Sequence, residues 1–377
     1  MENTCNQVLE LCLRGETCGD HLLDRALAVD GGRAFLSVVV ERMGDLFEPA
    51  LCEAYAELFT RVIHRVTPEL AHRIRKPAAT GAAPAATERV YVLSRVTLGA
   101  DVAVTSVLIA AAKRKYPSAE IVFVGSRKSY EMFETDSRIR YLAAPYARNG
   151  SLKERLKASA DLWLADGLVI DTDSRLSQLG LISLCPEDCY FWFPSRSYGG
   201  SSNIALPTLA AHWAEAVFAI ADAKPYVAPL ATNTAPAEIT VSLGVGENSA
   251  KRCGDDFESK LIKALAATGA RTVIDLGGDP EERAHVERTL VPGVSTHSGS
   301  FASFASLISN SKLYVGYDSA AGHVASACRV PLISIARGFV SDRMAARWRP
   351  NGTVIDANQP DVLQKAERAL ATYTFHR

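Results

Sequence analysis

The segment KLYVGYDSAAGHVASACRVP, Lys312 to Pro331, places residues that suit anion binding directly after an apolar strand. Asp318 and Ser319 come where a helix should begin, and small residues up to Gly322 follow them. Unpaired N–H groups and the dipole make the start of such a helix favourable for an anion. The segment therefore predicts a diphosphate site, with an ordinary N-cap at Asp318 or Ser319 as the alternative.

A second segment, SLGVGENSAKRC (Ser242 to Cys253), also follows an expected strand and precedes an expected helix. Gly244 and Gly246 let the backbone approach a ligand closely, and Lys251 and Arg252 bring positive charge to the same place. The spacing matches neither the P-loop nor the dinucleotide fingerprint. We expect a phosphate-binding loop that includes Asn248, with a solvated turn carrying two surface cations as the alternative.

The elements that must position these groups fall into three parts. Residues 1–75 have helical apolar spacing, and residues 76–88, KPAATGAAPAATE, read as a linker. From residue 89 short β-rich runs alternate with amphipathic stretches, and the rhythm restarts after a Pro- and Ala-rich connector. This predicts an α/β fold with two Rossmann-like domains facing a cleft, over residues 89–225 and 226–377. The final helix could pack back on the first of them.

Composition limits the classes of function. The chain has 377 residues, 48% of them hydrophobic and 22% charged, as in a soluble enzyme. Its net charge of −1 gives no general attraction to nucleic acid or anionic membrane. We expect no signal peptide and no transmembrane segment, free thiols at the eight scattered cysteines, and a cytoplasmic location.

The two phosphate-binding segments together resemble glycosyltransferase family 9, the ADP-heptose:lipopolysaccharide heptosyltransferases of GT-B fold. In that family a strand ends in Asp-Thr/Ser and a His follows five positions after the Asp, a spacing kept by Asp318, Ser319 and His323. The family glycine lies two positions after the Asp, where this chain has Ala320. The resemblance implies that Lys251 contacts the phosphates or the transferred sugar.

Other donor contacts are expected from the same resemblance. LGGDPEERAHVE (Leu276 to Glu287) is similar to the segment whose acidic residue binds the nucleotide ribose, which makes Glu281 or Glu282 the candidate. An acidic first helical turn is the alternative. The arginine-rich stretch after the last expected strand is similar to a family loop near the nucleotide, and Arg337 and Arg343 are its candidates for phosphate contact, with surface charge as the alternative.

The segment SRVTLGADVAVTSVLIAA (Ser94 to Ala111) resembles the strand, Gly-Asp turn and helix that open the family's other domain. One residue, Ala100, is inserted between Gly99 and Asp101. The family's Asp is the general base, so the resemblance assigns that role to Asp101. Inverting transfer needs a carboxylate to accept the proton of the attacking hydroxyl, and positive groups opposite it for the leaving diphosphate. An N-cap is the alternative for Asp101.

Two further segments are expected at the acceptor side of the cleft. Asp171, Asp173 and Arg175 follow one buried-looking strand, and Arg196 lies in a polar loop after an aromatic strand. Asp171-Thr-Asp173 resembles the metal-binding Asp-x-Asp of the GT-A fold. We expect no metal, because protein cations and helix ends stabilise the diphosphate in a two-Rossmann architecture.

The expected function is the inverting, metal-independent transfer of a sugar from a nucleoside diphosphate to a hydroxyl acceptor, without a cofactor. The resemblance implies that the sugar is heptose and that the donor is ADP-heptose. A non-hydrolysing sugar-nucleotide epimerase and a non-catalytic nucleotide-sugar-binding or scaffold protein are the alternatives. Residues 1–75 have no counterpart in the resemblance, and they could cover the acceptor side, form a homo-oligomer or dock a carrier.

Overall fold

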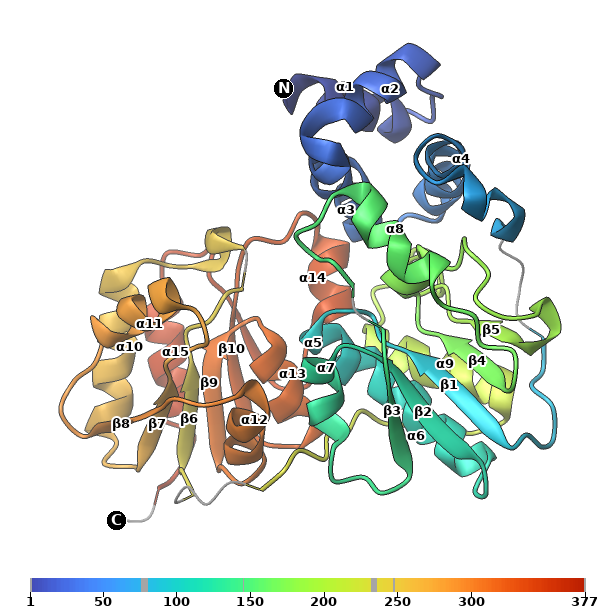
Figure 1. The fold of residues 1–377 in the computed structure, drawn as a ribbon. Coiled ribbons are helices and arrows are strands. Elements are labelled where there is room, and N and C mark those ends of the chain that lie inside the picture. The colour runs from blue at the N-terminus through green and yellow to red at the C-terminus, as the bar shows by residue number, and fades with distance from the viewer. Residues whose placement is uncertain (1, 76–80, 145, 232–235, 247, 376–377) are drawn as a thin grey trace.

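The computed structural model describes residues 2–75, 81–144, 146–231, 236–246 and 248–375. Two lobes built on β-sheets lie side by side, and the N-terminal helices lie above the lobe that contains β1 (Figure 1). Within the described residues no helix is both long enough and apolar enough to cross a membrane. All eight cysteines are free thiols.

The N-terminal region is helical, as its apolar spacing predicts. Its longest element, α4, begins at a proline that needs no hydrogen-bond partner in the first turn and buries one apolar face. The elements are α1 (Glu2–Leu13), α2 (Asp20–Ala28), η1 (Val29–Gly32), η2 (Phe35–Val40), α3 (Glu41–Asp45), α4 (Pro49–Val66) and η3 (Pro68–Arg73).

The first sheet is parallel, in the order β3-β2-β1-β4-β5. The strands at its centre are short and buried, as expected where both faces are covered, whereas the edge strand Ile139–Ala143 is mostly exposed or partly buried. The strands of this sheet are β1 (Arg89–Leu93), β2 (Glu120–Gly125), β3 (Ile139–Ala143), β4 (Leu168–Asp171) and β5 (Tyr190–Trp192). The intervening helical elements are α5 (Leu98–Ala100), η4 (Asp101–Thr105), α6 (Ser106–Lys115), α7 (Arg127–Tyr130), η5 (Glu131–Phe133), α8 (Leu152–Ala160), η6 (Arg175–Ser177), η7 (Glu187–Cys189) and α9 (Leu206–Phe218).

The N-terminal helices are not an independent appendage. Tyr91 and Leu93, on one face of β1, belong to the same apolar cluster as Phe35, Phe59 and Val62 of the helical region. Val90 and Val92, on the opposite face, pack with α6 and α9 instead. The helical region therefore completes one face of the first domain.

The second sheet is also parallel, in the order β11-β10-β9-β6-β7-β8, the order of a doubly wound dinucleotide fold. Its strands are β6 (Ile239–Ser242), β7 (Thr272–Asp275), β8 (Val294–His297), β9 (Leu313–Tyr317), β10 (Leu332–Ala336) and β11 (Thr353–Asp356). Its helical elements are η8 (Ser249–Lys251), α10 (Asp255–Ala267), α11 (Pro280–Glu287), α12 (Phe301–Ser309), α13 (Ala320–Ala327), α14 (Asp342–Trp348) and α15 (Val362–Leu370).

The last helix corrects one expectation. Ala366 and Leu370 of α15 are buried against the core of the second domain, and α15 packs on α10, β10 and β11. The helix therefore stays with the second sheet and does not return to the first domain.

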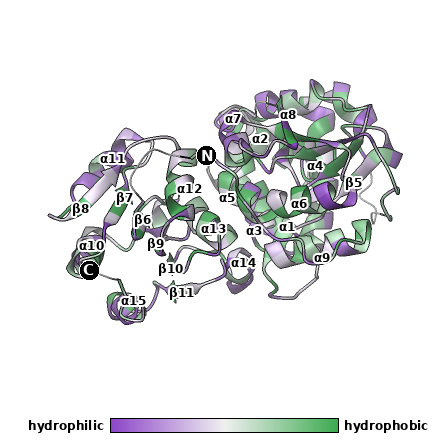
Figure 2. Cartoon of the chain, turned by 90° about the horizontal axis from the view of Figure 1, so that it is seen from below, coloured by the Kyte–Doolittle hydropathy of each residue, from purple (hydrophilic) through white to green (hydrophobic). Residues whose placement is uncertain are grey.

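The two domains meet through α5 and η4 of the first and α13 of the second (Figure 2). Gly99 permits this approach, because a Cβ atom there would lie 3.2 Å from Cδ2 of His323 and 3.3 Å from the Cα of Ala320. The carboxyl end of β1 thus faces the start of α13, where ligands bind in folds of this type.

Candidate active site

Lys251, at the end of η8, reaches the carboxyl end of β9. Its Nζ atom donates to Oδ2 of Asp318 at 2.8 Å and to the backbone oxygen of the same residue at 2.9 Å. Its side chain is about four-fifths buried, and Phe339 lies beside the ammonium at 5.8 Å. The structure therefore brings the two predicted phosphate-binding segments together. An ammonium carries three donors, so one remains for a ligand.

The start of α13 has no side-chain cap. Ser319 occupies the N-cap position in extended conformation, and its hydroxyl makes no hydrogen bond to the helix. That hydroxyl is buried and has no hydrogen-bond partner among the described residues. Gly322 leaves space, since a Cβ atom there would meet nothing nearer than Tyr314, at 3.8 Å. The helix start is therefore open to an acceptor of hydrogen bonds such as a phosphate oxygen.

His323 lies on the buried side of α13. Burial lowers the pKa of its imidazole, an effect that Asp318 opposes and Lys251 reinforces. The ring contacts Trp348 of α14 edge-on at 5.9 Å. A neutral, packed His323 can orient a ligand by hydrogen bonding but does not supply a positive charge.

Glu282, but not Glu281, lies at the glycine loop. Its carboxylate comes so near Gly244 that a Cβ atom on the glycine would lie 2.5 Å from Oε1. Burial raises the pKa of Glu282, with Asp275 adding to the effect and Arg252 opposing it. Glu281 is exposed, with its backbone N–H bonded to the N-cap Asp279.

The remaining loop residues divide between the site and the surface. Arg337 donates from Nη1 to the carbonyl of Arg252 at 3.1 Å and so joins the site. Arg252 itself is partly buried and lies 3.4 Å from Glu258. Asn248 is exposed and caps η8 through Ala250, and Gly246 is exposed with φ of +60°, a conformation that favours glycine.

Asp101 is not at the surface of the cleft. It is fully buried, Oδ1 accepts from the backbone N–H of Arg95 and from Thr105, and Oδ2 accepts from Ser94 at 2.7 Å. Burial raises the pKa of this carboxyl, which its hydrogen bonds oppose. A general base must reach the acceptor hydroxyl. In this conformation the carboxylate of Asp101 is held inside the first domain, and its assignment as the general base stays a prediction.

A π-helical turn explains the orientation of Asp101. In η4 the N–H of Ser106 bonds the carbonyl of Asp101, five residues earlier. Such a turn holds one residue more than an α-helical turn, which accommodates the extra Ala100. Asp101 instead holds the loop after β1 in place. In that loop Val96 adopts a φ of +61°, which is an outlier for a β-branched residue.

Arg95 is a site residue that sequence reasoning missed. Its guanidinium donates to the carbonyl of Thr172 and to Ser195, and it lies 5.9 Å from the ring of Trp348 in the other domain. Burial lowers its pKa to about 10, and its Nε has no partner in the described part of the chain. Its position directly after a strand that opens a Rossmann-like domain was the available signal.

The acceptor-side candidates form a buried charge cluster next to the N-terminal helices. Arg196 donates to Oδ2 of Asp173 at 2.8 Å, and Arg175 lies 2.6 Å from Glu41 of α3. Asp171 faces elsewhere and accepts from Ser177, Tyr190 and the N–H of Ser174. Asp171 and Asp173 therefore belong to separate networks.

Arg343 does not point to the phosphate site. It donates to the carbonyl of Phe47 at 3.2 Å and lies 2.6 Å from Glu48, both in the N-terminal region. Arg347, one turn later, is fully buried and donates to the carbonyls of Tyr198 and Gly200. Helix α14 thus joins the second domain to the helical region and to the loop of Arg196.

His297 ends strand β8. Its ring bonds Asp275 at 2.8 Å and Ser303 at 2.7 Å. Within the described residues no group of three or more His, Cys, Asp or Glu has the arrangement of a metal site.

Comparison with known proteins agrees with this architecture. No protein-family model matches the chain. Lipopolysaccharide heptosyltransferase 3 of Escherichia coli is 34% identical over 91 residues, which are 22% of this chain and 27% of that protein. The match thus spans little more than a quarter of the relative.

Solved structures match over far more of the chain. Glycosyl transferase family 9 from Veillonella parvula DSM 2008 has 13% identity and a TM-score of 0.56, covering 78% of this chain and 98% of its own. The E. coli heptosyltransferase WaaC with ADP has 15% identity and a TM-score of 0.56, and the match covers 75% of this chain and 99% of that chain. ADP-heptose LPS heptosyltransferase II of E. coli has 15% sequence identity and a TM-score of 0.54, and the match covers 75% of this chain and 98% of that chain. The expected GT-B fold and the resemblance to these proteins are confirmed.

Proposed function

We propose that the protein is a glycosyltransferase that moves a sugar from a nucleoside diphosphate to a hydroxyl acceptor. The observation that carries the proposal is the junction of Lys251 with Asp318 at the uncapped start of α13. A diphosphate placed there meets a cation, free N–H groups and the unpartnered hydroxyl of Ser319. The resemblance supports ADP-heptose as the donor.

The same groups account for departure of the diphosphate. Negative charge develops on the leaving phosphate as the glycosidic bond breaks, and preorganised donors stabilise it without reorganisation. Lys251 and the helix start supply these donors from the second domain, with Arg337 behind the loop. We propose a metal-independent transfer on this basis, and the resemblance supports inversion at the anomeric carbon.

Asp101 has a positioning role in this proposal. Its carboxylate holds the N–H of Arg95 and the hydroxyl of Ser94, so it sets the strained loop that faces α13. Because its oxygens are engaged in the fold, a second candidate function remains, that of a non-catalytic nucleotide-sugar-binding protein. The cytoplasm is the compartment we propose, since a reducing environment suits eight free thiols.

A thermal-shift series tests the proposal, because a ligand of the native state raises the melting temperature. ADP, UDP, GDP and CDP are compared first, and then ADP-heptose. Stabilisation by ADP and ADP-heptose above the other nucleotides is expected. ADP release from ADP-heptose that depends on an added acceptor identifies a transferase. Binding without turnover on any acceptor supports the second candidate, and no nucleotide binding overturns both.

A further inference from the structure

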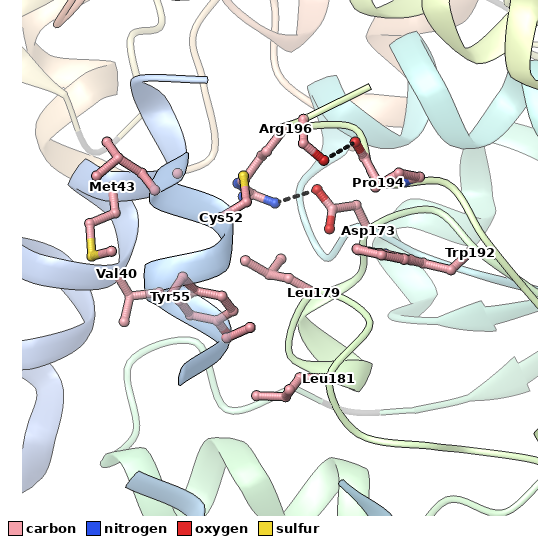
Figure 3. Close-up of a pocket in the computed structure, with 14 residues that line it drawn as sticks. Val40, Met43, Cys52, Tyr55, Asp173, Leu179, Leu181, Trp192, Pro194 and Arg196 are labelled. Atoms are coloured by element: carbon pink, nitrogen blue, oxygen red, sulfur yellow. Dashed lines mark hydrogen bonds and ion pairs between the residues drawn. The ribbon is translucent and has the colours of Figure 1, made fainter. Parts of the chain in front are cut away.

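Buried charged side chains lie in both domains of the protein. In the first domain, where it meets the N-terminal helices, Figure 3 shows the guanidinium of Arg196 paired with the carboxylate of Asp173. In the second domain a buried carboxylate belongs to Glu258, in the first turn of α10, and its side chain is 0% exposed. A buried carboxylate is costly unless hydrogen bonds and a cation compensate it, so its partners show what it holds in place.

Glu258 is bonded from three parts of the second domain. Its Oε1 accepts from the hydroxyl of Tyr317, at the end of β9, at 2.8 Å. The same oxygen accepts from Nη1 of Arg252, directly after η8, at 3.4 Å. Its Oε2 bonds Nε2 of His285 in α11. The carboxylate therefore connects a strand and a neighbouring helix to residues 248–254, which we call the donor segment because it carries Lys251.

The imidazole of His285 is oriented from its far side. Nη2 of Arg288 lies 3.1 Å from Nδ1 of the ring. Because a guanidinium can only donate, Nδ1 is the acceptor, and Nε2 carries the ring hydrogen that Glu258 accepts. A ring in this state is neutral. Arg252 is then the cation that compensates the charge of Glu258.

The hydroxyl of Tyr317 makes two hydrogen bonds in opposite senses. It donates to Glu258, and it accepts from the backbone N–H of Cys253 at 2.9 Å. Burial raises the pKa of Tyr317, so the hydroxyl keeps its proton and remains a donor. Loss of this hydroxyl would leave both the N–H of Cys253 and an oxygen of Glu258 without it, and such losses are costly in a buried place.

These bonds lie directly beside the ion pair of the donor site. Cys253 is two residues after Lys251, and Tyr317 immediately precedes Asp318. The two stretches of backbone that carry the ion pair are therefore joined to each other by the Tyr317 hydroxyl. Glu258 fixes the orientation of that hydroxyl, so the place of the Lys251 ammonium depends on a residue that does not contact it.

Arg252 belongs to the same support. Its guanidinium faces Glu258, and its backbone carbonyl accepts from Nη1 of Arg337 at 3.1 Å. Its charge also opposes the rise in the pKa of Glu282. The neighbouring Lys251 turns instead to Asp318. The basic pair is thus divided, with Arg252 anchoring the donor segment and Lys251 reaching the start of α13.

We propose that Glu258 is a positioning residue for the donor diphosphate, and that it acts through Tyr317 by holding the donor segment where the Lys251 ammonium meets the ligand. The proposal rests on the proposed function and adds to it a residue that does not touch the ligand. A cation held in place in advance binds charge without reorganisation. Loosening the donor segment should therefore weaken ADP binding although Lys251 is still present.

A double-mutant cycle tests this, with ADP binding to the full chain measured by calorimetric titration. Tyr317→Phe removes the hydroxyl and keeps the ring, and it should weaken ADP binding about fivefold or more. In a chain that already carries Lys251→Ala, the same change should alter the affinity by less than about twofold, because no ammonium is left to position. An equal loss in the two backgrounds, or no loss in either, overturns the proposal.

Two variants of α10 provide the matched control. Glu258→Ala removes the acceptor of Tyr317 and should weaken ADP binding about as much as Tyr317→Phe. Leu265→Ala, two turns later on the same helix, removes buried apolar volume and should lower the melting temperature. Its ADP affinity should stay within about twofold of the wild type. Equal losses of affinity in the two variants would make general destabilisation the cause and overturn the proposal. If Glu258→Ala does not fold, the cycle with Tyr317→Phe still decides.

The wild type and Lys251→Ala separate this proposal from the proposed function. ADP binding that is weakened by Lys251→Ala but not by Tyr317→Phe or Glu258→Ala refutes the positioning role and leaves the proposed function standing. A wild type that does not bind ADP refutes the proposed function, and the positioning role with it.

Discussion

The ammonium of Lys251 lies 2.8 Å from a carboxylate oxygen of Asp318, a residue 67 positions later in the chain. The contact joins the loop after β6 to the end of β9, which are neighbouring strands of the second sheet. Two segments chosen separately for their phosphate-binding character therefore form one site. The ion pair also keeps Asp318 compatible with a diphosphate, because the lysine offsets its charge.

Replacement of Asp101 separates a catalytic base from a positioning residue. Asp101→Asn retains an oxygen that can accept from Arg95 and an amide that can donate to Ser94, so the loop should keep its shape. We expect turnover of ADP-heptose to fall by less than about tenfold, because general-base catalysis contributes about 10²–10⁴-fold when it is removed.

The pH–rate profile of the same variant adds a second measurement. A positioning residue leaves the acidic limb of the profile where the wild type has it. A loss of about a thousandfold together with loss of that limb would identify Asp101 as the base, reached through a conformation other than this one.

Arg347 is predicted to be essential for the stability of the junction at α14. Arg347→Ala removes two hydrogen bonds to the carbonyls of Tyr198 and Gly200 and leaves both without their buried partner. The expected cost is about 2–4 kcal/mol. Thermal unfolding should show a drop of several degrees, whereas Arg349→Ala, at an exposed position in the same segment, should leave the melting temperature unchanged. Equal melting temperatures for Arg347→Ala and the wild type would show that Arg347 does not stabilise the junction at α14.

Asp45 predicts a specific dependence of stability on pH. Burial raises its pKa to about 6, with Glu41 adding to the effect. The raised pKa means that the folded state holds the proton more tightly, so this contribution is fully present below the unfolded pKa of about 3.9 and is lost as the pH rises through 6.

Asp45→Asn should therefore raise the free energy of unfolding at pH 8, by about 3 kcal/mol at most, and by less at pH 5. Denaturant unfolding at the two pH values provides the measurement. An increase of the same size at both would show that the charge of Asp45 is not its cause.

Gly322 provides a test of backbone contact at α13. A methyl group there meets no atom closer than 3.8 Å, and alanine is the better helix former by about 0.5–1 kcal/mol. Gly322→Ala is thus expected to raise the melting temperature slightly. It is also expected to weaken the binding of ADP, because the methyl group lies where we propose that the ligand approaches the helix. Unchanged ADP affinity would place the diphosphate elsewhere.

Several features followed from sequence patterns alone. The alternation of strands and helices predicted both parallel sheets, and helical spacing predicted the N-terminal region. Strands β8 and β11 were missed, because both are edge strands with mostly uncovered side chains and so lack an apolar signature.

The site was predictable where it depends on strand ends and not where it depends on distant contacts. Lys251 and Asp318 follow neighbouring strands, so their meeting could be foreseen. The burial of Asp101 depends on a π-helical turn that residue spacing does not reveal. Arg343 bonds the carbonyl of Phe47, which is 296 residues earlier, and no local pattern identifies such a partner.

The central claim is that a nucleoside diphosphate binds between Lys251 and α13, and calorimetric titration with ADP tests it most directly. Lys251→Ala removes the cation and exposes the ligand to the unpaired charge of Asp318, so ADP should bind at least about tenfold more weakly than to the wild type. Lys260→Ala, on the surface of α10 and paired with Asp256, should bind ADP like the wild type. Equal affinity of Lys251→Ala and wild type, or no ADP binding by the wild type, would contradict the account.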